Sequence, residues 1–381
     1  MSRRSLSTAA PLGAFLLAGL FRGIAAAAPS RAVDKDIAGI VDLFHDLQFE
    51  SALKESEGLK KRYPGHPAGD FYRSVSYFER YLLEDPRSPQ TLKSYEEANA
   101  LCLSAAEAYR STDTATAELY LAAGYGFHAR MFAAQKQYRQ AVSEAKRSFD
   151  HVNIAIRLEP ERDDAYLGLG MFNYFMARIP PAAKPFAYLV TGVWGERDKG
   201  LAQLERVAKH GTAAKMEART VLSAIYASDK EKLWDQAEPL LAELMERYPH
   251  NPIPRLRRVY TAERRRDYDA ALRMADPDGA WIKQLRPEVR QKALLNARYR
   301  AAECLIFLNR APEAAPHLKI LESVPLPERL HYWVLLRRAD YWKALGDADQ
   351  AERGYRALKG SPPAAGSKTV MPFNDGSGLT H

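Results

Sequence analysis

The sequence contains little cysteine and almost no signal for β-strands. Only two cysteines occur among its 381 residues. Cys102 and Cys304 each lie in an apolar, helix-like pattern and are far apart in the chain, so two separate buried thiols are favoured over a disulfide. Runs of alternating β-branched residues and Asn-Gly hairpin signals are missing, which argues against a β-rich fold. Apolar residues make up 46% of the chain, which is ample for a packed core.

Motifs for metal binding and catalysis are also missing. The nine histidines are scattered singly, without HxxxH or HExxH spacing, and no CxxC occurs, so no metal site is expected. His128 lies on a predicted helix face near small residues and is interpreted as a structural or surface histidine. Neither a GxSxG elbow nor a glycine-rich phosphate loop with lysine is present. We therefore predict no catalytic residues, no cofactor and no enzymatic activity. A hydrolase that uses scattered carboxylates is the alternative.

The one candidate membrane segment lies at the N-terminus. Arg3 and Arg4 precede an apolar stretch at residues 11–21, and alanines follow at 25–27. The stretch is too short and too weakly apolar to anchor the chain in a bilayer, so it predicts a secretory signal, residues 1–27. The paired arginines also fit twin-arginine export, and the Sec route stays open beside it. We expect an exported protein, periplasmic or secreted.

The formal net charge of +8 is mild for this length and predicts no nucleic-acid partner. The densest basic run is RLRRVYTAERRR, whose arginines spread around a helix instead of forming one stripe. A solvated face with local ion pairs is therefore expected. The alternative is peripheral contact with an anionic membrane or an acidic peptide. The arginines of this run are Arg255, Arg257, Arg258, Arg264, Arg265 and Arg266.

Apolar and alanine positions recur at three- and four-residue spacing over residues 34–359, which predicts an all-α domain. Two segments align without a gap: FESALKESEGLKKRYPGHP from Phe49 and WDQAEPLLAELMERYPHNP from Trp234. Both carry an alanine, Ala52 or Ala237, and a later Tyr-Pro pair, and this arrangement resembles the second helix of a tetratricopeptide repeat. The small alanine allows two helices to approach closely. We predict a solenoid of antiparallel helix pairs, about six to eight of them from the repeat length.

More degenerate units of this kind occur elsewhere in the chain. They carry the same alternation of small and large apolar residues around a turn. They span residues 125–145, 268–271, 302–325 and 335–358. The tail at residues 360–381 has no helical period and is expected to be disordered.

The central segment, residues 163–226, departs from the repeat. Gly168 and Gly170 lie inside a predicted helix, where each costs about 1 kcal/mol relative to alanine, so we expect another backbone to pack very close. A proline-broken aromatic insert follows at residues 179–195, and an amphipathic helix comes after it.

This segment resembles a known group of proteins. The order G-x-G-x-F-N, a helix ending in I-P-P, an apolar bridge and G-x-x-x-x-G-L-x-x-L is similar to the eukaryotic tetratricopeptide-39 and inclusion-body-clearance proteins, and to bacterial exported tetratricopeptide proteins. The resemblance implies an all-α repeat scaffold without known catalysis, and it carries over no partner. The matching positions are Gly168, Gly170, Phe172, Asn173, Pro180, Pro181, Gly195, Gly200, Leu201 and Leu204.

Two functional hypotheses follow. In the first, the protein is an exported, non-enzymatic scaffold that binds a protein or peptide on the concave face of the array through first-helix side chains. In the second, it carries or senses a small apolar or lipid-like ligand at the insert. A further interpretation is that the insert aromatics only pack on neighbouring helices. The first-helix candidates are Tyr125, Arg130, Phe132, Tyr166 and Tyr174, and the insert candidates are Phe172, Phe186, Tyr188 and Trp194.

Overall fold

The structure, a computed structural model, describes residues 31–84, 87–179, 181 and 184–359. The predicted signal, residues 1–27, and the predicted tail, residues 360–381, lie outside the described residues. The described residues form helices and contain no β-strand, which confirms the predicted all-α class. No helix in these ranges is long and apolar enough to cross a membrane.

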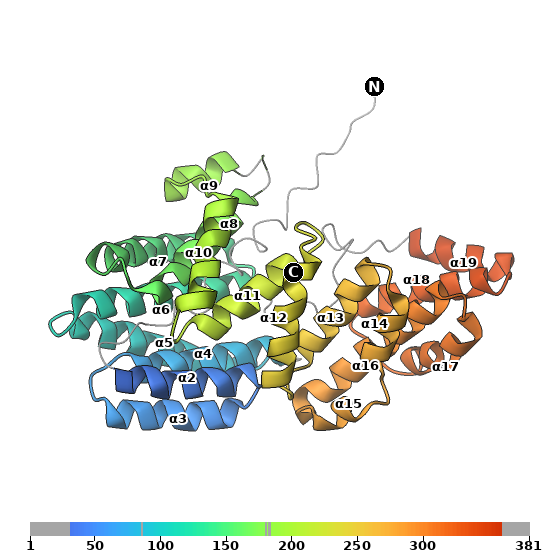
Figure 1. The fold of residues 1–381 in the computed structure, drawn as a ribbon, viewed down its shortest axis with the longest axis horizontal. Coiled ribbons are helices and arrows are strands. Elements are labelled where there is room, and N and C mark those ends of the chain that lie inside the picture. Colours follow the sequence, from blue (N-terminus) through green and yellow to red (C-terminus); the bar gives the residue numbers. More distant parts are fainter. Residues whose placement is uncertain (1–30, 85–86, 180, 182–183, 360–381) are drawn as a thin grey trace.

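The helices follow one another with short connections (Figure 1). The first are α2 (Arg31–His45), α3 (Phe49–Arg62), α4 (Ala68–Leu83), α5 (Pro89–Tyr109), α6 (Thr114–Ala134) and α7 (Tyr138–Leu158). The central ones are the 3-10 helix η1 (Asp163–Ala165), α8 (Tyr166–Ala177), α9 (Lys184–Thr191), α10 (Arg197–His210) and α11 (Lys215–Tyr226). The last are α12 (Trp234–Arg247), α13 (Pro252–Arg264), α14 (Tyr268–Ala275), α15 (Ala280–Gln284), α16 (Pro287–Phe307), α17 (Ala311–Glu322), α18 (Glu328–Ala344) and α19 (Ala348–Lys359).

Helices that are neighbours in the sequence pack on one another along most of the chain. Such pairs include α3 with α4, α6 with α7, α16 with α17 and α18 with α19. The central segment departs from this order, because α8 packs on α10 and the intervening α9 projects away from the stack (Figure 1).

Several turns between consecutive helices share one backbone ending. In each of these turns, the residue two positions before the following helix has a positive φ, between 59° and 82°. The backbone N–H of the residue after it donates a hydrogen bond of 2.8–3.0 Å to the carbonyl five positions before that donor, in the last turn of the preceding helix. This is a Schellman ending, which satisfies the last carbonyls of the first helix. Its recurrence indicates that one helix-turn-helix unit repeats along the chain. The residues in the left-handed region are Leu47, Lys136, Arg266, Asn309 and Gly346.

The two segments that align in the sequence also match in structure. They form α3 and α12, each 14 residues long. Each ends at a tyrosine with nearly the same backbone angles, φ −126° and ψ 71° at Tyr63, φ −124° and ψ 68° at Tyr248. A buried alanine stands three residues into each second helix, as the small-residue argument predicts. These alanines are Ala52, Ala141, Ala237, Ala271, Ala314 and Ala351, each at most 4% exposed.

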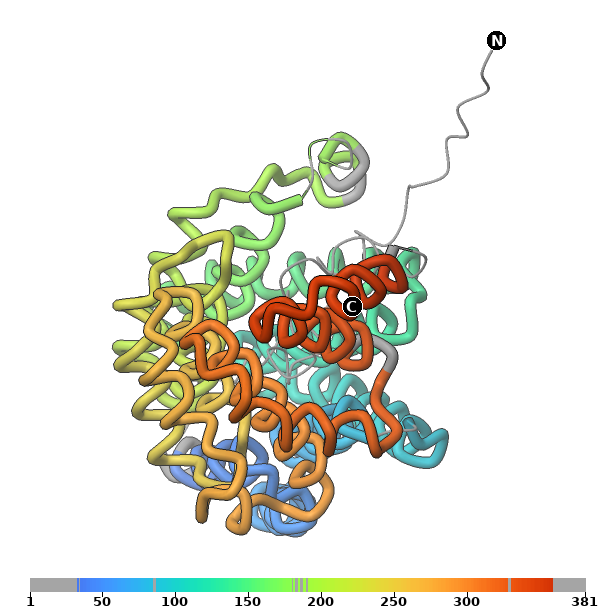
Figure 2. Tube along the Cα trace, turned by 90° about the vertical axis from the view of Figure 1, so that its right-hand side faces the viewer, coloured from blue at the N-terminus to red at the C-terminus, as the bar shows by residue number. Residues whose placement is uncertain are grey.

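The N-terminal helices also meet helices from much later in the chain. His45, in α2, has its Nε2 3.0 Å from a carboxylate oxygen of Glu217 in α11. The neighbouring Asp46 accepts a hydrogen bond at 3.0 Å from the backbone N–H of His250. One hydrophobic core accordingly runs from Val33 to Tyr248. A straight stack of helix pairs would not bring these residues together, so this part of the chain curls back on itself (Figure 2). The sequence analysis did not predict this closure.

The two cysteines are separate, free and buried, as predicted. Burial raises the pKa of both thiols, mainly because a thiolate would lose its hydration there. Cys102 belongs to the main core, and Cys304 to a smaller cluster in the C-terminal part.

Candidate interaction surface

Three of the predicted binding residues lie in the core. Arg130 is 1% exposed, and its guanidinium lies 4.2 Å from the ring centre of Phe78 and 5.0 Å from that of Phe127. Phe172 is 1% exposed and Tyr174 is 4% exposed. A partner cannot reach these side chains in this arrangement of helices, so we correct the predicted surface by removing them from it. Helices α6 and α8 each pack against several other helices, and this packing buries the three side chains.

Helix α6 nevertheless has a narrow accessible face. Between Ala115 and Ala133 every side chain is buried except those of Tyr125, His128 and Phe132, which are partly exposed. Their spacing of three and four residues places them on one side of the helix. Tyr125 and Phe132 were predicted as binding residues from the sequence. His128 was interpreted there as structural or surface-exposed.

Two carboxylates from other helices hold His128. Its Nδ1 lies 3.2 Å from Glu144 in α7, and its Nε2 lies 3.1 Å from Glu96 in α5. Burial lowers the pKa of this imidazole, but the hydrogen bonds and negative charges of Glu144 and Glu96 outweigh burial and raise the pKa to about 9. A histidine that stays protonated at neutral pH is a poor general base. The arrangement therefore suits binding and positioning.

Aromatic side chains flank this histidine. The ring of Phe132 lies 4.4 Å from that of His128. Tyr125 stacks on His151 in α7, with ring centres 5.4 Å apart and planes at 11°. The guanidinium of Arg147 lies 5.3 Å from the ring centre of Tyr125. We call Tyr125, His128 and Phe132 the α6 face. The groups that hold its side chains come from α5 and α7, so no pattern within α6 predicts these contacts.

Tyr166 lies apart from this face and is held by local contacts. Its hydroxyl donates a hydrogen bond to the carbonyl of Pro160 at 3.0 Å. The guanidinium of Arg206 lies 4.1 Å from the centre of its ring and also pairs with Asp163 at 2.5 Å. The structure therefore does not gather all the predicted first-helix residues into one site.

The α8–α10 crossing explains one of the glycines of the central segment. A Cβ built on Gly170 would lie 3.0 Å from the carbonyl oxygen of Gly200. A Cβ on Gly200 would lie 2.5 Å from the backbone nitrogen of Tyr174, closer than real Cβ contacts allow. The two backbones are in contact at this crossing, which confirms the close approach predicted from Gly170.

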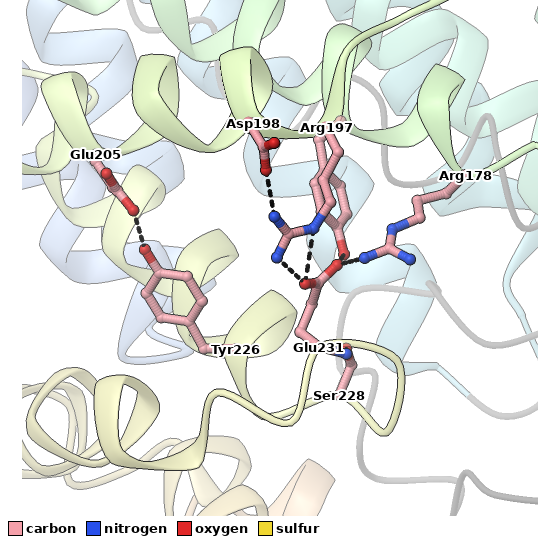
Figure 3. Close-up of polar contacts among 8 residues, drawn as sticks. Arg178, Arg197, Asp198, Glu205, Tyr226, Ser228 and Glu231 are labelled. Carbon is pink, nitrogen blue, oxygen red and sulfur yellow. Dashed lines mark hydrogen bonds and ion pairs between the residues drawn. The ribbon is translucent and has the colours of Figure 1, made fainter.

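A buried carboxylate locks this helix pair to the loop before α12 (Figure 3). The side chain of Glu231 is 2% exposed. It accepts hydrogen bonds from the Tyr174 hydroxyl at 2.8 Å and from Nε of Arg197 at 3.0 Å, and it also pairs with Arg178. Its backbone N–H donates to the Ser228 hydroxyl at 3.3 Å. Arg197 also pairs with Asp198, so two acids face the two arginines, and we interpret this cluster as structural. Glu231 lies in a loop far along the chain from α8, so no sequence pattern predicts this contact.

Large apolar side chains in α9 and just after it are exposed. Tyr188 is 41% exposed, Leu189 81% and Trp194 54%. The rings of Tyr188 and Trp194 stack on each other, with centres 4.4 Å apart and planes at 14°. We call these three side chains the α9 patch. The helix packs against α7 and projects from the stack (Figure 1). The side chain of Phe186, also predicted to line a site here, lies outside the described residues.

The predicted basic run does not form one cationic surface. Arg257 is 5% exposed, and Arg255 lies with its guanidinium 5.0 Å from the ring centre of Trp281. The others either pair with nearby acids or lie in a turn. Arg258 pairs with Glu238, Arg264 with Asp229, Arg265 with Asp235, and Arg266 forms the turn before α14. These contacts match the expected local ion pairs, and contact with an anionic membrane stays a prediction.

No metal-binding cluster of histidine, cysteine, aspartate or glutamate occurs among the described residues. In comparisons with known proteins, no family model matches the sequence, and no curated protein matches it either. The resemblance to tetratricopeptide proteins therefore stays a prediction from the sequence pattern.

Proposed function

We propose that this chain is an exported, non-enzymatic scaffold of tetratricopeptide-like helix pairs that binds a protein or peptide partner. The observation that carries the proposal is the α9 patch. Exposed aromatic and aliphatic side chains that lie together on a soluble protein are typical of interaction sites, and tyrosine and tryptophan supply large contact areas at low entropic cost. Leu189, with 81% of its surface exposed, would be the central apolar contact.

The α6 face would be a second contact area. It presents a protonated imidazole between two aromatic rings, which suits a partner with polar and apolar groups in alternation. The sequence analysis placed the partner on the concave face of the array, contacted by first helices, and Tyr125 and Phe132 keep that role in the proposal. Export is inferred from residues 1–27.

The alternative function is a carrier or sensor of a small apolar or lipid-like ligand at the insert. A carrier encloses most of its ligand in a cavity. Tyr188 and Trp194 instead stack on each other and remain 41% and 54% exposed, which favours a flat contact with a macromolecule over an enclosed ligand. For this reason we place the protein or peptide partner first.

The experiment places a photo-cross-linking residue at position 189 in the exported protein within its native envelope. We expect one dominant cross-linked adduct, reduced about tenfold by Trp194→Ala because the stacked pair is lost. The control puts the same residue at Leu101 in α5, which is 46% exposed and far from α9 in the sequence. Equal adducts at both positions, or none at position 189, would contradict the proposal. A lipid-sized mass in native mass spectrometry would support the carrier instead.

A further inference from the structure

A cleft of about 540 Å³ lies where the N-terminal helices face α16. Its walls come from α3, α4 and the start of α16, which are widely separated in the sequence. This volume is within the range of small-ligand sites. The cleft does not include the α9 patch or the α6 face, so the inference below does not depend on the proposed function.

The cleft combines an apolar wall with charged groups. Leu47, Phe49, Leu83 and Val289 line one part of it. Leu47 and Leu83 also pack against the hydrophobic cluster that contains Trp281. An apolar group in the cleft would therefore extend a hydrophobic cluster that already joins the N-terminal helices to α13, α15 and α16.

Most of the charged groups in the cleft are matched. Arg80 pairs with Glu50 at 2.6 Å and with Glu84 at 3.2 Å. Lys292 donates a hydrogen bond to the carbonyl of Leu83 at 2.9 Å. Glu288 lies at the exposed rim, where water solvates its carboxylate. These contacts hold most of the charged side chains of the walls, and one guanidinium of the lining has no partner among the described residues.

That cation is Arg286, the residue before α16. Its guanidinium forms no hydrogen bond or ion pair with any described residue, and its Nε is buried without a partner. A buried donor without an acceptor costs about 1–3 kcal/mol, and more where the group is charged. The residue as a whole is partly exposed and lines the cleft, so a carboxylate bound there would meet the guanidinium.

We infer that the cleft binds a carboxylate attached to an apolar body. The planar guanidinium of Arg286 matches a carboxylate through two parallel hydrogen bonds. One guanidinium without a partner suits one carboxylate, and the acids of the lining, with Glu288 at the rim, would repel a ligand with more negative charge. Leu47, Phe49, Leu83 and Val289 would hold the apolar body. The carboxylate could be the C-terminus of a peptide that ends in an apolar residue, or that of a small fatty acid.

The test is calorimetric titration of the whole chain with N-acetyl-Phe-Leu, with its C-terminal amide and with octanoate. We expect the acid form of the peptide or octanoate to bind, and the amide to bind about tenfold more weakly than the acid. Binding of the peptide acid but not octanoate would identify a peptide terminus as the source, and the reverse would identify a fatty acid. Equal binding of peptide acid and amide, or no binding of either carboxylate up to about 5 mM, would overturn the inference.

Variants of Arg286 test whether this residue binds the carboxylate. Arg286→Gln should weaken carboxylate binding about tenfold, and Arg286→Lys should weaken it less because the charge remains. The matched control is Lys283→Gln, an exposed cation in α15 that does not line the cleft. Since the Arg286 guanidinium has no partner among the described residues, its removal breaks no contact there and should leave the melting temperature unchanged or raise it. Unaltered binding by Arg286→Gln would contradict the assignment.

Discussion

The guanidinium of Arg247 donates hydrogen bonds to both carboxylate oxygens of Asp42, at 2.9 and 2.7 Å, although 205 positions separate the two residues. The hydroxyl of Tyr248 donates to the same carboxylate at 2.8 Å. These bonds attach α2 to α12 on the rim of the curled N-terminal part. The buried contact of His45 with Glu217 lies at the same junction.

A double-mutant cycle of Asp42→Ala and Arg247→Ala tests this junction. The two side chains are 37% and 47% exposed, so we expect a coupling free energy of about 0.5–1 kcal/mol. The coupling should shrink in about 1 M salt, where exposed charges are screened. Urea denaturation of the four proteins measures it. Zero coupling at low salt would mean that α2 and α12 do not meet as described.

Gly200→Ala should destabilise the protein strongly. Its Cβ would come within 2.5 Å of the Tyr174 backbone nitrogen and 2.7 Å of the Gly170 carbonyl oxygen, and neither backbone atom can move without separating α8 from α10. We expect a loss of about 3 kcal/mol in the free energy of unfolding, or no folded protein. The control is Gly39→Ala in α2, where a Cβ meets nothing within 4 Å. That change should stabilise by about 0.5–1 kcal/mol. If urea denaturation showed equal effects of Gly200→Ala and Gly39→Ala, the close contact of the α8 and α10 backbones would be refuted.

The sequence predicted the features that depend on local pattern. The all-α class follows from apolar spacing, and the buried Ala52 and Ala237 follow from matching two segments of the chain. The contact of Gly170 with a second backbone follows from the cost of glycine inside a helix. Each of these inferences needs only residues within one or two helices.

Features that depend on the number of neighbours of a helix could not be predicted in this way. Helix α6 is covered on nearly every side, so Arg130 is buried although an arginine in a first helix suggested an exposed binding residue. Tyr174 is buried because Glu231 reaches it from a distant loop. The carboxylates that hold His128 also come from two other helices. Patterns within one segment of sequence contain no information about such long-range contacts.

Glu231→Ala should loosen the central helices. It would leave Arg178 and Arg197 without their buried counter-charge and Tyr174 without its acceptor. The two guanidiniums are 27% and 37% exposed, so water solvates them in part and we expect a smaller loss than for a fully buried pair, about 1–3 kcal/mol. Hydrogen–deuterium exchange should become faster in α8 and α10 and stay unchanged in α16. Glu196→Ala removes an acid that is 69% exposed and is the matched control. Unchanged exchange in α8 would show that the cluster does not hold this helix.

Stability should fall as the pH rises from about 6.5 to about 9 because of His128. Its folded-state pKa of about 9 lies above its unfolded value, so the folded state holds the proton more tightly. The stabilisation is complete below about pH 6.5 and is lost as the pH passes about 9. The imidazole is 22% exposed, so we expect this stabilisation to be about 1–2 kcal/mol after solvent screening.

A second group titrates in an overlapping pH range, because burial, the largest cause, raises the pKa of Glu263 to about 8. The measurement is therefore the difference in urea denaturation between wild type and His128→Gln at each pH, with the exposed His210→Gln as control. A difference that does not vary between pH 6.5 and 9 would mean that Glu96 and Glu144 do not hold a protonated His128.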